Sequence, residues 1–528
     1  MKPKRRNLKK YFAVLATSLS VSVSVSVSVL AAEDNPRITI DTTQPGATIH
    51  RDIYGQFAEH LGRGIYEGIW VGKDSDIENI NGFRTDVIEA LREINVPLVR
   101  WPGGCFADEY RWRDGIGPRD QRPVRVNTHW GGVEEDNAFG THEFFELVEL
   151  LGAEAYVNGN LGTGNPREMA EWLEYMTGTS NSAVVEERRK NGRDEPWKIA
   201  YFGVGNEAWG CGGHMRPAYY ADLYNHFATF LKTPRGSEPK FVASGGHTTD
   251  TSWTDTLSKN VQRQMDGISF HFYTLPTGEW EDKGESTGFE EDQWFSTLWQ
   301  TLRMDEFIRL NKKVLDKNDP EKKLGFYVDE WGTWYNPEEG REPGFLYQQN
   351  TLRDAVVAAL NFNVFHEHAD RVHMTNIAQM VNVLQAMILT DKDEMVLTPT
   401  YHVYDLYQVF QDATALPLEI ENPRSYRVGD QSLPGISASA ARGKDGEVYL
   451  SLVNLDPNQA QTVSVDVKGL EVTAASGRLI TASAMDARNT FDAPRQVEPA
   501  KYRAEGEASG ELQLQVPAKS VLVVALND

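Results

Sequence analysis

The chain has 528 residues, of which 40% are hydrophobic and 24% are charged, and its formal net charge at pH 7 is −23. This length exceeds what one small core can hold, so we expect a globular protein of two or three domains. A protein this acidic repels the phosphates of nucleic acids and of anionic lipids, which excludes both as principal partners. A neutral polysaccharide meets no such repulsion.

The first 32 residues form a distinct N-terminal segment. A basic stretch at 1–10 precedes an apolar, serine-containing run at 11–30, and the small residues Ala31 and Ala32 follow. This order is typical of a secretory signal peptide. An uncleaved membrane anchor is the alternative, and we give it less weight because serine dilutes the run. We predict a signal peptide over residues 1–32 and a secreted or periplasmic protein without membrane attachment after cleavage.

The segment that follows predicts strands and then a parallel α/β architecture. Residues 36–50 alternate apolar and polar side chains around a Gln-Pro-Gly turn, as an exposed pair of strands does. From about residue 51, short apolar strands alternate with helical patterns. The strands are predicted at residues 53–58, 96–101, 153–158, 199–205, 240–245, 267–273, 324–329 and 371–376, and the helices at 83–94, 141–151, 166–177, 217–232, 291–316 and 348–368. Eight such strands indicate a (β/α)8 barrel, which we place at 51–394.

The C-terminal part of the chain shows a different pattern. Short, alternating, turn-separated segments lie at 433–441, 446–454, 460–467, 476–483 and 511–526. They are typical of an all-β sandwich, jelly-roll-like in form, which we place at 395–528. The strands of residues 33–50 have no place in the barrel, so we expect them to join the sandwich.

Two glutamates follow predicted barrel strands. The run IAYFGVGNEAWG at 199–210 carries Glu207, and a second apolar run from Leu324 to Val328 leads to Glu330. Catalytic groups of β/α barrels sit at this end of the strands. The chain between the two glutamates is long enough for three β/α units of about 30 to 50 residues each.

Two carboxylates in this position suggest a retaining glycosidase. One serves as the acid/base and the other as the nucleophile, with the carboxyl groups about 5–5.5 Å apart. Apolar and aromatic neighbours would keep the acid protonated. For any single glutamate a salt bridge or a helix cap is the better explanation, but the pair, in this pattern and spacing, favours catalysis.

Seven stretches carry a resemblance to a known family. They are IYGQFAEHLGRGIYEGIW (53–70), VRWPGGCFADEYRW (99–112), GNLGTGNP (159–166), GVGNEAWGCGG (203–213), HFY (271–273), DEWGTWY (329–335) and NIAQMVNVLQA (376–386). With them the chain resembles the glycoside hydrolase family 51 α-L-arabinofuranosidases over essentially all of the sequence after the leader. The resemblance implies that Glu207, on the fourth strand, is the acid/base and that Glu330, on the seventh, is the nucleophile. One departure is Ala208, where the family usually has the second asparagine of Asn-Glu-Asn-Trp.

The resemblance also implies which residues hold the arabinofuranose ring. They are Glu59, Cys105, Asn206, Tyr273 and Gln379. Asn206 can donate to the sugar 2-hydroxyl, a contact that strengthens in the transition state. Glu59 can accept from two sugar hydroxyls, and Tyr273 can donate to the nucleophile and orient it.

Further candidates surround these residues. His271 is expected to support the nucleophile or its neighbours. Candidate walls or leaving-group platforms are Trp101, Trp130, Trp331 and Trp334. For His271 and these four tryptophans, ordinary packing at the barrel rim is the alternative. Trp209 is expected to form a wall near the acid.

Cys105 and Cys211 are the two cysteines of the chain. Both lie in loops that we assign to the site, and the sequence leaves open whether they pair. Free thiols that pack or donate weakly are the safer interpretation, because a chain of this size does not depend on disulfides.

The sequence therefore predicts a retaining, exo-acting α-L-arabinofuranosidase that cleaves arabinoxylan, arabinan or their oligosaccharides without a metal or an organic cofactor. His366 and His368 resemble a metal pair, but on a helix they diverge by about 200° and do not easily share an ion. We interpret them as a feature of the helix surface or its C-terminal end. The first alternative is a β-xylosidase or endo-glucanase on the same barrel. The second is a non-catalytic carbohydrate-binding protein, which the presence of both Glu207 and Glu330 argues against. The resemblance also implies a homo-oligomer, often a hexamer.

Overall fold

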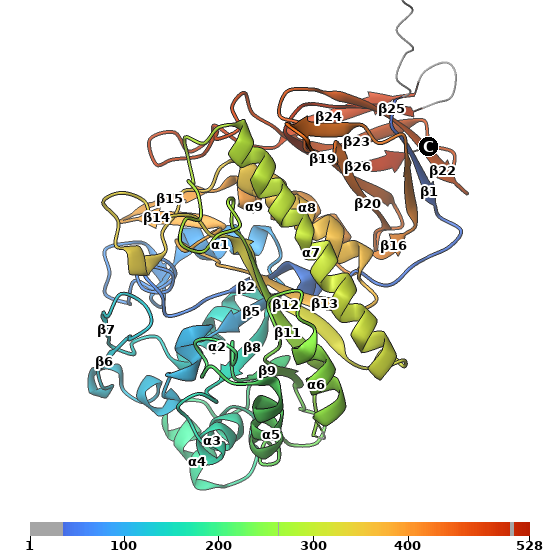
Figure 1. Cartoon of the computed structure of the whole chain (residues 1–528). Helices are drawn as coiled ribbons and strands as arrows, with labels where there is room; N and C mark the ends of the chain where they lie inside the picture. Colours follow the sequence, from blue (N-terminus) through green and yellow to red (C-terminus); the bar gives the residue numbers. More distant parts are fainter. Residues whose placement is uncertain (1–34, 262, 507–511, 528) are drawn as a thin grey trace, which may run out of the picture. The chain divides into compact units, whose positions relative to one another are not determined.

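The computed structural model describes residues 35–261, 263–506 and 512–527 (Figure 1). These residues belong to one compact unit, Asn35–Asp528. The predicted signal peptide at 1–32 lies outside the described residues. Among the described helices, none has the length and apolar character that crossing a bilayer requires.

A closed barrel of eight parallel strands is the first part of the fold. Its strands are β2 (Gly55–Phe57), β5 (Leu98–Trp101), β8 (Glu154–Gly159), β9 (Tyr201–Val204), β10 (Lys240–Ala243), β11 (Gly267–Thr274), β12 (Gly325–Thr333) and β13 (Val372–Ile377). The barrel closes where β13 pairs in parallel with β2. All eight predicted strands are confirmed, because each is a short, nearly continuous buried run of the kind that a parallel sheet covered on both faces requires.

Helices follow the barrel strands along the chain. They are α1 (Thr85–Glu93), α2 (Thr141–Leu151), α3 (Pro166–Thr177), α4 (Ala183–Lys190), α5 (Pro217–Ala228), α6 (Ser252–Asn260), α7 (Glu291–Asn318), α8 (Leu352–Glu367) and α9 (Pro399–Tyr407). The six predicted helices are confirmed. Helices α4, α6 and α9 were not predicted; α6, for example, is short and buries only Trp253, Thr254 and Leu257, too few positions for a clear helical period.

Two sheets form the sandwich, a mixed sheet of four strands and an antiparallel sheet of six. One has the order β17-β1-β22-β25 and the other β16-β20-β21-β26-β23-β24. The strands are β1 (Arg37–Asp41), β16 (Thr414–Leu416), β17 (Leu418–Glu421), β20 (Ile436–Arg442), β21 (Val448–Asn454), β22 (Gln461–Lys468), β23 (Ala474–Ile480), β24 (Ala500–Glu505), β25 (Leu512–Val516) and β26 (Ser520–Asn527). Side chains from both sheets, among them Ile38, Leu450 and Val463, share one apolar core.

The N-terminal strand joins this sandwich as expected. Strand β1 pairs in parallel with β22 and antiparallel with β17. The second strand predicted within 36–50 is wrong, since only the isolated bridge from Thr48 to Thr414 forms there among the described residues. The predicted single segment 511–526 is two strands, β25 and β26, with a turn between them.

Four short two-stranded hairpins lie outside the two sheets and the barrel. They are β3 (Asn79–Ile80) with β4 (Phe83–Arg84), β6 (Arg125–Val126) with β7 (Glu134–Glu135), β14 (Ile388–Asp391) with β15 (Glu394–Leu397), and β18 (Ser425–Val428) with β19 (Gln431–Pro434). The β6–β7 hairpin lies in the long connection after β5, which also carries Trp130 at the site described below.

Helix α8 packs against the sandwich on one side and the barrel on the other. The amide of Asn363 donates to the hydroxyl of Ser437, and His366 bonds to Ser439 Oγ at 2.8 Å and to the hydroxyl of Tyr54 at 2.7 Å. His366 is therefore buried between the two parts, which corrects our interpretation of it as a helix-surface feature. The position at the C-terminal end of the helix is confirmed.

Candidate active site

A cavity of about 720 Å³ opens at the carboxyl ends of the barrel strands. Ten of the thirteen residues predicted for the site line it: Glu59, Cys105, Trp130, Glu207, Trp209, His271, Tyr273, Glu330, Trp334 and Gln379. Another, Asn206, is buried beside them and accepts a hydrogen bond from Arg100 at 2.7 Å. Residues far apart in sequence thus meet where a β/α barrel usually places its catalytic groups.

Glu207 follows the fourth strand, β9, and its backbone has the left-handed φ of 38°. Its Oε1 lies 2.8 Å from Nδ1 of His271. Burial raises the pKa of Glu207, and the charge of Glu330 adds to this, while His271 and Arg100 oppose it. A carboxyl with a raised pKa suits a group that must carry a proton before it reacts.

Glu330 lies within the seventh strand, β12, which continues past it to Thr333 rather than ending before it as predicted. Its Oε1 is paired with Nη1 of Arg100 at 2.8 Å. Its Oε2 accepts a hydrogen bond from the hydroxyl of Tyr273 at 2.9 Å. Two donors, one of them charged, therefore fix the orientation of this carboxylate.

The two glutamates approach each other across the cavity. One carboxylate oxygen from each, together with a ring nitrogen of His271, lie within 4.8 Å of one another. This separation suits direct attack on a sugar held between the carboxyl groups, whereas an inverting enzyme keeps them about 6.5–9.5 Å apart to admit a water.

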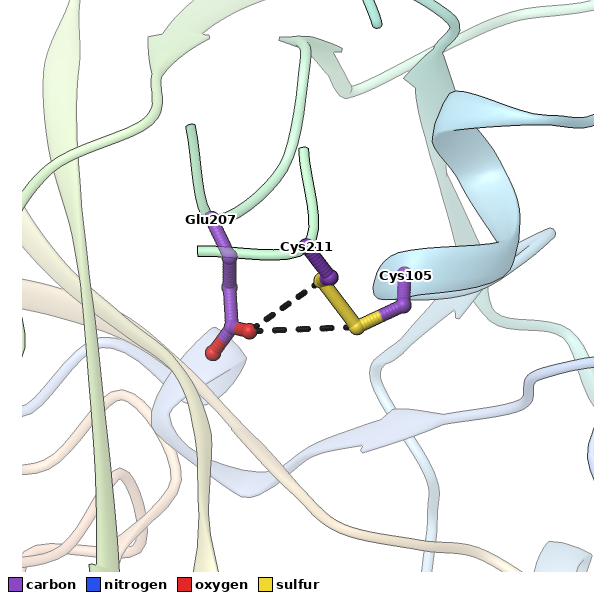
Figure 2. A group of neighbouring side chains, drawn as sticks. All are labelled: Cys105, Glu207 and Cys211. Carbon is purple, nitrogen blue, oxygen red and sulfur yellow. Dashed lines mark hydrogen bonds between the residues drawn. A yellow bond between two sulfur atoms is a disulfide. The ribbon is translucent and has the colours of Figure 1, made fainter. Parts of the chain in front are cut away.

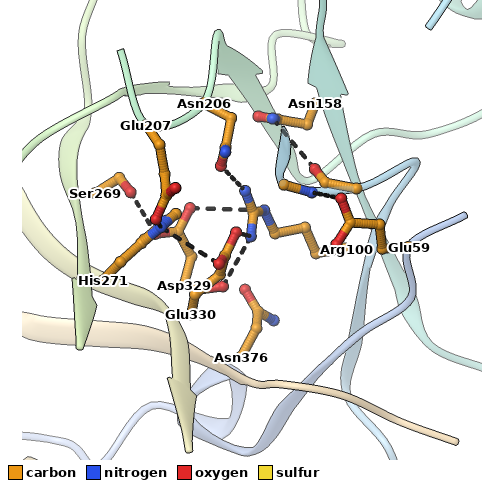
Figure 3. A network of polar contacts seen from close by, with 12 residues as sticks. Glu59, Arg100, Asn158, Asn206, Glu207, Ser269, His271, Asp329, Glu330 and Asn376 are labelled. Atoms are coloured by element: carbon orange, nitrogen blue, oxygen red, sulfur yellow. Dashed lines mark hydrogen bonds and ion pairs between the residues drawn. The ribbon is translucent and has the colours of Figure 1, made fainter. Parts of the chain in front are cut away.

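His271, on β11, lies among three carboxylates (Figure 3). Its Nδ1 is 3.4 Å from Oε2 of Glu330, and its Nε2 is 3.3 Å from Oδ1 of Asp329. Burial alone would lower the pKa of His271, but Glu330, Asp329 and Glu207 raise it to about 10. The ring is therefore a cation at neutral pH, and it offsets part of the negative charge of the site.

Arg100 and Asp329 are parts of this network that the sequence prediction missed. Arg100, on β5, is fully buried and contacts Glu330, Asn206 and the backbone carbonyl of Asp329. Burial would raise the pKa of Asp329, but Arg100 and His271 hold it well below its usual range. The sequence could have predicted a role for Arg100, because an arginine inside the apolar strand LVRW is buried and needs a partner of opposite charge.

Glu59 is held by four donors. Its Oε1 accepts from the backbone N–H groups of Gly104 and Phe106 and from Nε1 of Trp130, each at 3.0 Å. Its Oε2 accepts from Nε2 of Gln379 at 3.1 Å. Burial and the charge of Glu330 raise the pKa of Glu59 to about 7, although the hydrogen bonds from Phe106 and Trp130 and the charge of Arg100 oppose the shift.

The predicted aromatic walls divide into two groups. Trp130, Trp209 and Trp334 line the cavity, and Trp209 stacks on His247 with ring centroids 3.5 Å apart. Trp101 and Trp331 are fully buried, so their assignment as walls or platforms is wrong. Their indole N–H groups bond to His60 and Thr375, and their rings pack on helices α2 and α8, since alternate residues of a strand point away from the cavity.

The two cysteines form a disulfide, Cys105–Cys211 (Figure 2). Our prediction of free thiols is therefore wrong. The pairing depends on two loops that follow different strands, β5 and β9, and that meet only in the closed barrel. Nothing in the spacing of the two residues indicates this contact.

Three groups place potential metal ligands close together in the described residues. They are Cys105, Glu207 and Cys211; Glu207, His271 and Glu330; and Asp305, Glu367 and His368. The sulfurs of the first group are bonded to each other, and the histidine of the second is protonated and donates rather than coordinates. In the third, Asp305 already pairs with His368 and Arg309. These contacts explain the three groups without an ion.

Family models match two segments of the chain. Residues 90–283 match the α-L-arabinofuranosidase 1 domain, and residues 329–520 match the α-L-arabinofuranosidase C-terminal domain. A protein from Bacteroides ovatus, named an intracellular exo-α-L-arabinofuranosidase, is 48% identical over 94% of this chain and 96% of its own. The crystal structure of the GH51 arabinofuranosidase from Xanthomonas axonopodis pv. citri superimposes with a TM-score of 0.92 at 52% identity, covering 93% of this chain and all of that one.

The chain belongs to glycoside hydrolase family 51. An α-L-arabinofuranosidase from Thermotoga maritima, solved as an arabinose complex, matches this family 51 enzyme with a TM-score of 0.82 at 31% identity, over 93% of this chain and 99% of that one. The resemblance inferred from the motifs is confirmed, as is the (β/α)8 barrel with a C-terminal sheet domain.

The comparison overturns the predicted location of this family 51 enzyme. We predicted a secreted or periplasmic protein, but the relative from Bacteroides ovatus, similar over almost its whole length, is named intracellular. The signal peptide predicted over residues 1–32 lies outside the described residues and stays a prediction.

Proposed function

We propose that the protein is a retaining, exo-acting α-L-arabinofuranosidase that releases terminal L-arabinofuranose from arabinoxylan, arabinan or their oligosaccharides. The observation that carries this proposal is the pair Glu207 and Glu330, with carboxylate oxygens within 4.8 Å of each other at the strand ends of the barrel. The similarity to a relative named an exo-acting arabinofuranosidase supports the choice of sugar and the mode of attack.

In the first step, Glu207 protonates the glycosidic oxygen while Glu330 attacks the anomeric carbon. The raised pKa of Glu207 keeps its proton available, and Arg100 and Tyr273 orient the attacking carboxylate. The leaving group departs through an oxocarbenium-like transition state, and a covalent arabinosyl-enzyme forms.

In the second step, Glu207 acts as the base. It takes a proton from a water that attacks the anomeric carbon, and the bond to Glu330 breaks. The protonated His271 lies beside both glutamates and stabilises the one that is charged. This is Glu330 before the first step and Glu207 in the arabinosyl-enzyme. Two inversions leave the released arabinose with the configuration of the substrate.

The remaining cavity residues hold the sugar in this proposal. Glu59 accepts from sugar hydroxyls, and Asn206 donates to the 2-hydroxyl, with Gln379 beside Glu59. The disulfide sulfur of Cys105 contributes a contact surface rather than a thiol donor. Trp130, Trp209 and Trp334 form walls around the arabinose and its leaving group.

The test is product release from a matched set of substrates. Wild-type protein should release 4-nitrophenol from 4-nitrophenyl α-L-arabinofuranoside and free arabinose from arabinoxylan, and Glu330→Ala should do neither. Cleavage of the β-D-xyloside or of cellulose, with no cleavage of the arabinofuranoside, would instead assign a β-xylosidase or an endo-glucanase. Sugar binding without any release would assign a binding protein.

We further propose how the chain divides and assembles. The barrel comprises residues 51–394, and the sandwich comprises 395–528 with 33–50, as the pairing of β1 with β17 and β22 supports. The assembly is a homo-oligomer, a hexamer by resemblance to the family. Light scattering on the purified protein gives the subunit number, and a monomer would contradict the assembly.

A further inference from the structure

The Cys105–Cys211 disulfide joins two loops of the active site. Cys105 begins a short 3-10 helix, Cys105–Asp108, after β5, and Cys211 lies in the loop after β9, 106 residues later in the sequence. Both cysteines line the catalytic cavity. The bond therefore ties the loop that carries Glu207 to the loop that binds Glu59.

The disulfide contacts one oxygen of Glu207. Oε2 of Glu207 lies 3.4 Å from Sγ of Cys211 and 3.9 Å from Sγ of Cys105 (Figure 2). A sulfur in a disulfide carries no hydrogen, so neither can donate. Among the described residues no other group donates to this oxygen, whereas Oε1 meets His271. One side of the carboxyl thus faces a surface without hydrogen-bond donors.

The same loop is held at a second point. Asp108 accepts hydrogen bonds from the backbone N–H groups of Asn206 at 2.9 Å and of Leu161 at 2.7 Å. Gly212 passes so close that an added Cβ would lie 1.9 Å from the carbonyl oxygen of Asn206. Asp108 and the disulfide therefore fix the residues on both sides of Glu207, whose own backbone is in the left-handed region.

We propose that the Cys105–Cys211 disulfide is a positioning pair for Glu207, and that its reduction impairs acid catalysis by giving Oε2 a thiol donor and freeing the loop. This inference rests on the proposed role of Glu207 as the acid/base. In the reduction, a dithiol such as dithiothreitol supplies two electrons and two protons and becomes its own cyclic disulfide. The S–S bond breaks, and Cys105 and Cys211 become thiols.

The direction of the effect follows from hydrogen bonding. A thiol is a weak donor, and a donor to the ionised form of a carboxyl favours that form. The other groups that face Glu207 are His271, Glu330, Tyr273 and Arg100, and reduction changes none of them. A general acid works only while protonated, so the high-pH limb of activity should move to lower pH on reduction.

The experiment compares kcat/KM against pH for the oxidised and the dithiothreitol-reduced wild-type enzyme, with thiol titration to verify each state. Two substrates are used: an arabino-oligosaccharide, whose leaving group needs a proton, and 4-nitrophenyl α-L-arabinofuranoside, whose leaving group does not. Reduction should shift the high-pH limb for the oligosaccharide down by roughly half a pH unit, the size expected for a weak donor. It should lower kcat/KM for the oligosaccharide several-fold more than for the aryl substrate.

Two double variants separate the donor from the cross-link. The double variant Cys105→Ala with Cys211→Ala has neither a thiol donor nor a cross-link. The high-pH limb of its activity profile should therefore stay where the oxidised enzyme has it, while kcat/KM falls. Cys105→Ser with Cys211→Ser replaces the thiols by hydroxyl donors and should reproduce the shift of the reduced enzyme. Coincident profiles for oxidised and reduced wild type, or two free thiols in the air-oxidised enzyme, would overturn the inference. Absence of activity on the aryl arabinofuranoside in the oxidised enzyme would instead overturn the proposed function.

Discussion

Tyr273 donates its hydroxyl to Oε2 of Glu330 at 2.9 Å, while Arg100 occupies the other oxygen. Tyr273→Phe removes one of the two donors that orient the carboxylate. We expect kcat on 4-nitrophenyl α-L-arabinofuranoside to fall by roughly 10²-fold with little change in KM, since the lost contact acts on the attacking group rather than on substrate binding.

A matched variant checks that this loss is local. Tyr404 is buried, whereas Tyr273 is half-buried at the cavity, and the hydroxyl of Tyr404 has no hydrogen-bond partner in the described structure. Tyr404→Phe should keep wild-type kcat. A Tyr273→Phe enzyme within twofold of wild type would show that Tyr273 does not orient Glu330.

Gly104 gives a steric test of the same carboxylate. An added Cβ at Gly104 would lie 2.5 Å from Oε1 of Glu330, which Arg100 holds in place. Gly104→Ala should therefore displace the carboxylate and lower kcat by about 10²-fold or more, because a misplacement of about 1 Å costs that much. The measurement is kcat together with the melting temperature.

Gly246→Ala is the control for that variant. An added Cβ at Gly246 meets no heavy atom closer than 3.6 Å, which is ordinary van der Waals contact. It should retain near wild-type kcat. If Gly104→Ala does the same, Glu330 does not act from the position seen in this structure.

The charge on His271 should make the stability of the protein depend on pH. Its pKa is raised in the folded protein from 6.5 to about 10. A histidine with a raised folded pKa contributes stability that is fully present below the unfolded pKa and is lost as pH rises through the folded pKa. The stability lost in His271→Asn should thus be largest at pH 6 and shrink towards pH 10, as urea unfolding at both values would show. An equal loss at both pH values would contradict a charged His271.

The same variant should move the activity profile. His271 lowers the pKa of Glu207 through its hydrogen bond and its charge. Without it the pKa of Glu207 rises further, so the high-pH limb of kcat/KM on an arabino-oligosaccharide should shift to higher pH. A shift to lower pH would indicate that another group carries the catalytic proton.

Asn363 tests the contact between helix α8 and the sandwich. It is 4% exposed and accepts hydrogen bonds from Ser451 at 2.8 Å and from Tyr407 at 3.1 Å. Asn363→Ala leaves buried polar groups without partners, so we expect the free energy of unfolding to fall by about 2 kcal/mol. Activity per folded molecule should not change, because Asn363 lies outside the catalytic cavity.

The barrel strands could be predicted because their signal is local. A buried parallel strand such as β9, YFGV, is a short apolar run that ends abruptly in polar residues, and the sequence alone displays it. The position of Glu207 after this strand follows directly. Glu330 was harder to place, since β12 runs on through the polar residues Asp329 and Glu330 and only pairing with β11 reveals its length.

The contacts inside the site could not be predicted from local pattern. Arg100 meets Glu330 across 230 residues of sequence, and Cys105 meets Cys211 across 106. Such pairs depend on how the barrel closes. Trp331 was wrongly predicted to line the site because it follows Glu330 in the sequence. Side chains alternate in direction along a strand, so Trp331 points away from the cavity and is buried.

The most direct test of the account is azide rescue of Glu207→Ala on 4-nitrophenyl α-L-arabinofuranoside, with the product identified by NMR. If Glu207 is the acid/base and Glu330 the nucleophile, azide attacks the arabinosyl-enzyme and gives the α-L-arabinofuranosyl azide, with the configuration of the substrate. Glu330→Ala should give no such product. A β-configured azide from Glu207→Ala, or normal hydrolysis by Glu330→Ala, would contradict the assigned roles.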